Sequence, residues 1–109
     1  MSNAHLTLEA ANKLISKKQA LGRLLQNPDF KAVVLDGYFK DECVRLVMAK
    51  GTPSMDSPEA QAAVIRDIDS ISSFKGYLQV IEHEANLAEK AIEDHNEDVS
   101  DGPADSDEE

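Results

Sequence analysis

The chain has 109 residues and carries 21 acidic against 11 basic side chains, a net charge of -10. Hydrophobic residues make up 41%, aromatic residues 5%, and Trp is absent, so any core has to be small and aliphatic. No uninterrupted apolar run exceeds four residues, which is too short for a membrane span, and the lone Cys43 has no partner for an internal disulfide. We therefore expect one domain, made in a reducing cytoplasm, with no cofactor and no membrane contact.

The acidic charge is concentrated at the C-terminus. Residues 93–109 contain nine acids and no base, whereas residues 1–92 are almost neutral. Such a segment has little apolar surface to bury and its charges repel one another, so we expect residues 93–109 to form a disordered acidic tail. The tail either keeps the protein in solution or contacts a basic protein surface. Direct nucleic-acid binding is not expected, because no recognised module is present and basic residues are not interleaved with aromatic ones.

The first half of the sequence predicts two helices. Thr7 is a suitable N-cap for a helix over about residues 8–26. The pair Asn27-Pro28 then supplies a cap and a first-turn proline, which predicts a second helix over residues 28–49. The dipeptide Asp36-Gly37 predicts a kink or a break within the second helix.

The second half predicts one long helix over residues 58–94. Ser57, Pro58 and Glu59 provide a cap, a first-position proline and an acid in the first turn. From residue 74 onward, apolar residues recur at alternating steps of four and three, a heptad spacing. This stripe consists of Phe74, Leu78, Ile81, Ala85, Ala88 and Ile92. The spacing fits both a coiled-coil seam and a helix face covered by the protein's own core.

Together these elements predict an all-α fold in which residues 1–92 form an elongated helical hairpin. A helix of about 37 residues cannot bury its whole stripe against one partner of 20 residues. The two shorter helices laid end to end would cover it. Alternatively, the distal part of the stripe is an interaction surface, and the chain forms a homo-oligomer or a complex with other proteins.

The polar residues show no pattern typical of a catalytic or metal site. Glu82-His83-Glu84 resembles part of a zinc-protease motif, but Leu87 stands where that chemistry needs a second His. Cys43 falls on an apolar helix face and is expected to be a small core residue. No serine has a neighbouring base, and no glycine-rich phosphate loop is present. We predict no catalytic, cofactor-binding or metal-binding residue, and no enzymatic activity.

Several short segments resemble small helical proteins of tailed-bacteriophage genomes, over about residues 20–92. They are Gln26-Asn27-Pro28-Asp29-Phe30, Gly37-Tyr38-Phe39, Arg45-Leu46-Val47 and Ser57-Pro58-Glu59-Ala60-Gln61. The resemblance implies a non-enzymatic virion or head–tail assembly protein, present in many copies, that acts by burial between subunits. It also implies synthesis in the host cytoplasm, incorporation into the virion, and an acidic tail that either meets a basic portal, capsid or ejection protein or repels packaged DNA.

Two other functions stay open on the sequence. An acidic regulatory protein could mimic nucleic acid or inhibit a basic host protein, although such mimicry needs acids on a rigid face. A scaffolding or chaperone-like helper, released after assembly, would have the same composition as a virion component.

Overall fold

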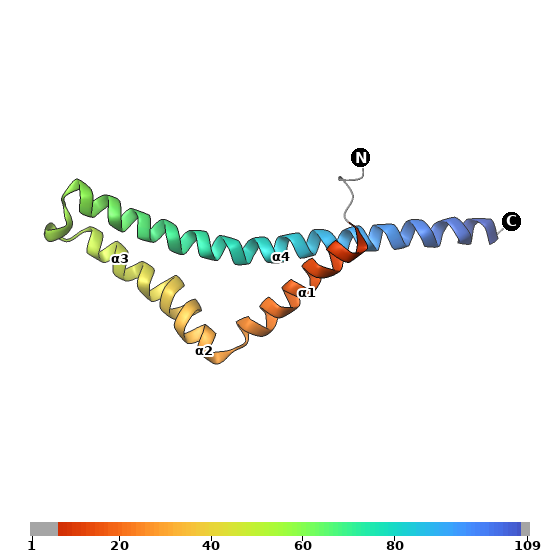
Figure 1. The fold of residues 1–109 in the computed structure, drawn as a ribbon, viewed down its shortest axis with the longest axis horizontal. Helices are drawn as coiled ribbons and strands as arrows, with labels where there is room; N and C mark the ends of the chain where they lie inside the picture. The colour runs from red at the N-terminus through yellow and green to blue at the C-terminus, as the bar shows by residue number, and fades with distance from the viewer. Residues whose placement is uncertain (1–6, 108–109) are drawn as a thin grey trace. The chain divides into compact units, whose positions relative to one another are not determined.

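The computed structural model describes the backbone of residues 7–107 and the side chains of residues 7–97. Every regular element in this range is helical, which confirms the predicted all-α class. Figure 1 traces the elements in chain order: α1 (Leu8–Leu25), α2 (Pro28–Phe30), η2 (Lys31–Glu42), α3 (Cys43–Lys50), η3 (Pro53–Met55) and α4 (Pro58–Asp107). The long predicted helix is α4; the shorter ones are α1 and the continuous run from α2 through η2 to α3.

The predicted helix starts are confirmed by their capping bonds. Thr7 Oγ1, Asn27 Oδ1 and Ser57 Oγ each accept backbone N–H groups of the following first turn, at 2.8 to 3.1 Å. Pro28 and Pro58 occupy first helical positions. A backbone N–H at this position has no acceptor within the helix, so proline, which lacks the N–H, costs no hydrogen bond there. Local capping chemistry therefore fixes where these helices begin.

The long helix extends further than predicted. Its expected end lies near Asp94, but α4 continues to Asp107. Lys90 Nζ lies 3.7 Å from Asp94 Oδ2, an i,i+4 pair within the predicted helix. Residues 93–97, counted in the tail by the sequence, are helical and exposed. The side chains of residues 98–109 lie outside the described part, and disorder of the acidic tail stays a prediction.

The centre of the second helical run is not an α-helix. The twelve residues of η2 form a π-helix, in which each N–H bonds to the carbonyl five residues earlier. The half-buried apolar residues recur once per wider turn; they are Phe30, then Val34 with Leu35, then Tyr38 with Phe39, and then Cys43. At Asp36-Gly37, where the sequence predicts a kink or a break, the helix continues with π-helical instead of α-helical hydrogen bonds.

The chain divides into two compact units. Unit 1 combines residues 1–21 with residues 80–109, and unit 2 consists of residues 22–79. Each has its own buried residues.

Unit 2 is an antiparallel helical hairpin. Its core contains Leu46 of α3 with Val64 and Ile71 of α4. The half-buried apolar residues packed around them are Tyr38, Phe39, Cys43, Met55 and Ile68. Cys43 thus packs against the core, as expected from the sequence.

Side-chain hydrogen bonds hold the connection between α3 and α4, and Thr52 Oγ1 donates one of them to the carbonyl oxygen of Ala49 at 2.8 Å. Gln61 Nε2 donates to the carbonyl oxygens of Lys50, at 2.9 Å, and Met55, at 2.6 Å. It thereby satisfies a carbonyl at the end of α3 and another in η3. The short connection is visible in Figure 1, where α3 turns back into the start of α4.

Unit 1 pairs α1 with the later part of α4. The buried side chains are Ala11 and Leu21 of α1 together with Ile81, Ala85 and Ala88 of α4. Lys18 Nζ reaches across from α1 to Asn86 Oδ1 at 2.8 Å and to Glu89 Oε1 at 3.3 Å. Small side chains at the contact let two helices approach closely.

Candidate interaction surfaces

In unit 1, the chain's own helix covers the predicted stripe. Ile81 is 8% exposed, and Ala85 and Ala88 are fully buried. Ile92, the last stripe residue, is half-buried. This part of the stripe is therefore core, with little side-chain surface left for another protein.

In unit 2, the stripe continues into an aromatic cluster. The Phe74 ring packs edge-on against Phe39, with centroids 5.4 Å apart, and lies 6.2 Å from Tyr38. Such pairs add to the stability that burial alone provides. Leu78 is half-buried. The stripe residues, spaced alternately by four and three, thus make contacts within each unit. This agrees with the interpretation of the stripe as a helix face covered by the protein's own core.

A different set of apolar side chains remains exposed in unit 2. Three lie on α3: Val44 at 57%, Val47 at 53% and Met48 at 69%. Ile65 of α4 is 45% exposed. We call these four residues the α3–α4 apolar face. Because Leu46 of the same short helix is buried, α3 is apolar on both its inner and its outer side, a pattern typical of a helix surrounded by protein.

Helix geometry places Val47 and Ile65 on the same side of the hairpin. Each directly follows a buried residue, Leu46 and Val64. In two antiparallel helices whose buried residues face each other, positions one step after the buried ones point to the same flank. Val44 lies three residues before Val47 and is its neighbour on α3, whereas Met48, one residue after Val47, points about 100° away from it, toward the side of α3 that faces away from α4. Val44, Val47 and Met48 thus cover the outer side of α3, and Ile65 shares a flank with Val47.

The opposite flank of the hairpin is charged. Arg45 donates from Nε to Glu42 Oε1 at 2.9 Å and from Nη2 to Glu42 Oε2 at 2.6 Å. These hydrogen bonds hold the pKa of the Glu42 carboxyl below its ordinary value. They raise the pKa of Arg45, and the charge of Asp67 on α4 raises it further. Arg45 and Asp67 thus share one flank, which leaves the other to Val47 and Ile65.

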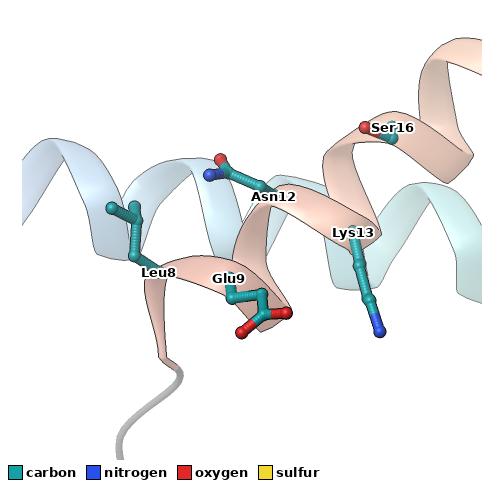
Figure 2. A pocket seen from close by; sticks show the side chains of 5 residues that line it. All are labelled: Leu8, Glu9, Asn12, Lys13 and Ser16. Carbon is teal, nitrogen blue, oxygen red and sulfur yellow. The ribbon is translucent and has the colours of Figure 1, made fainter.

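The hollow on α1 has no convergent chemistry. It is lined by Leu8, Glu9, Asn12, Lys13 and Ser16. Figure 2 shows that these side chains extend away from one another, with Glu9 and Lys13 on one side and Asn12 on the other. A binding pocket needs polar groups aimed at a common point. This hollow is a surface groove of a single helix.

Within the described residues, no group of three or more His, Cys, Asp or Glu side chains is close enough to hold a metal ion. Over the same part of the chain, no helix has the length and apolar character needed to cross a membrane. A comparison with known proteins finds no matching family, and no curated protein or solved structure gives a match.

Sequence reasoning missed the α3–α4 apolar face because it followed the longest periodic stripe. A signal was present: residues 43–50, CVRLVMAK, are apolar around most of the helix circumference. The inner side of this segment can be told from its outer side only in the structure, where Leu46 is buried.

Proposed function

We propose that this chain is a non-enzymatic structural protein that works by burying a helical face against another protein. The observation that carries the proposal is the α3–α4 apolar face, which exposes three large uncharged side chains on the outer side of α3 and a fourth, Ile65, on α4. Single exposed apolar residues are common on soluble proteins, whereas contiguous ones mark contact sites. Enriched methionine is also a feature of such contacts, because its flexible side chain adapts to a partner.

The assembly that we propose is a bacteriophage particle, in which the chain is a multi-copy virion or head–tail assembly component. This finer assignment rests on the resemblance of the segments around Asn27-Pro28, Gly37-Tyr38-Phe39 and Ser57-Pro58 to small helical phage proteins. Binding through an apolar helix face fits a protein that is fixed between subunits. The acidic C-terminal segment would then contact a basic surface of a neighbouring component.

The experiment is quantitative mass spectrometry of purified particles from the phage that encodes the chain. Wild-type chain is expected in many copies per particle. Met48→Asp, which puts a charge on the face, is expected to lower the copy number at least tenfold. The matched control is Leu87→Asp, an equally drastic change at an exposed position of unit 1. Complete absence of the wild-type chain from particles would contradict the virion assignment, and equal incorporation of Met48→Asp would contradict the role of the face.

A further inference from the structure

We draw no further inference here: the strongest candidate, the apolar outer side of α3 formed by Val44, Val47 and Met48, carries none, because nothing in the structure shows what covers it.

Discussion

A methyl group placed on Gly37 would lie 2.9 Å from the carbonyl oxygen of Ala32. Ala32 is five residues earlier, the acceptor position of a π-helical hydrogen bond. Glycine therefore lets this turn of η2 close where a side chain would be too near the backbone. We expect Gly37→Ala to lower the free energy of unfolding by about 1–3 kcal/mol, the range for overpacked sites. Urea unfolding followed by circular dichroism measures the change.

Two other glycines provide matched controls for this substitution. Gly22 in α1 and Gly76 in α4 have open space around the position of a Cβ. Alanine is the better helix former by about 0.5–1 kcal/mol, so Gly22→Ala and Gly76→Ala should stabilise the protein. If Gly37→Ala stabilised it by a similar amount, η2 would not depend on its glycine, and the argument from Ala32 would be wrong.

The close contact of α1 with α4 predicts that unit 1 tolerates no enlargement at its centre. Ala88 is fully buried, so Ala88→Leu should lower the free energy of unfolding by about 1–3 kcal/mol. The control is Ala91→Leu on the exposed side of the same helix, where the change should stay within about 0.5 kcal/mol. Equal effects of the two substitutions in thermal unfolding would show that α1 does not pack on Ala88.

The ion pair of Glu42 with Arg45 makes a prediction about pH. The hydrogen bonds from Arg45 lower the pKa of Glu42 in the folded chain. A lowered carboxyl pKa contributes stability above the unfolded pKa and loses it as the pH falls through the folded pKa. Because the pair is exposed, the loss in stability should be small. Arg45→Gln is expected to return the pKa of Glu42 to its ordinary range in an NMR titration of the carboxyl carbon.

The control for this titration is Lys90→Gln, which removes a cation from unit 1 and leaves the hydrogen bonds to Glu42 in place. The pKa of Glu42 should then remain low. If Arg45→Gln left the pKa of Glu42 unchanged, the hydrogen bonds at 2.9 and 2.6 Å would not form in solution.

Removal of residues 93–109 is expected to leave the rest of the protein folded. The truncation takes away nine acids and no base, which changes the net charge from -10 to -1, and it removes no residue of the stripe. Only the exposed pair of Lys90 with Asp94 is lost among the ion pairs that the described side chains form, at a cost below about 1 kcal/mol. Binding to a basic protein should weaken and lose most of its salt dependence.

Thermal unfolding and a binding titration at two salt concentrations test both parts of this prediction. Unfolding of residues 1–92 after truncation would show that the acidic segment supports the fold. Unchanged, salt-dependent binding to the basic protein would show that the acids elsewhere in the chain are responsible.

The sequence by itself determined the helices and their starting points. Thr7, Asn27 and Ser57 cap as predicted, because an N-cap bond joins residues only two or three positions apart and needs no tertiary contact. The all-α class followed from helical spacing of apolar residues, which is likewise a local property. The sequence predicts an end near Asp94, where a run of mutually repelling acids begins, whereas α4 continues to Asp107.

Only the tertiary structure decided which apolar residues are core and which are surface. The heptad stripe from Phe74 to Ile92 fits both a seam with another subunit and an internal core, and in the structure Ala85 and Ala88 are buried within unit 1. Tyr38 and Phe39 of η2 pack against Phe74, a contact between residues distant in the sequence that no local pattern specifies. Leu46 packs against Val64 and Ile71, and this contact defines which side of α3 is the inner one and which is the outer one. Burial depends on which segments meet in three dimensions, and periodicity along one helix does not specify its partner.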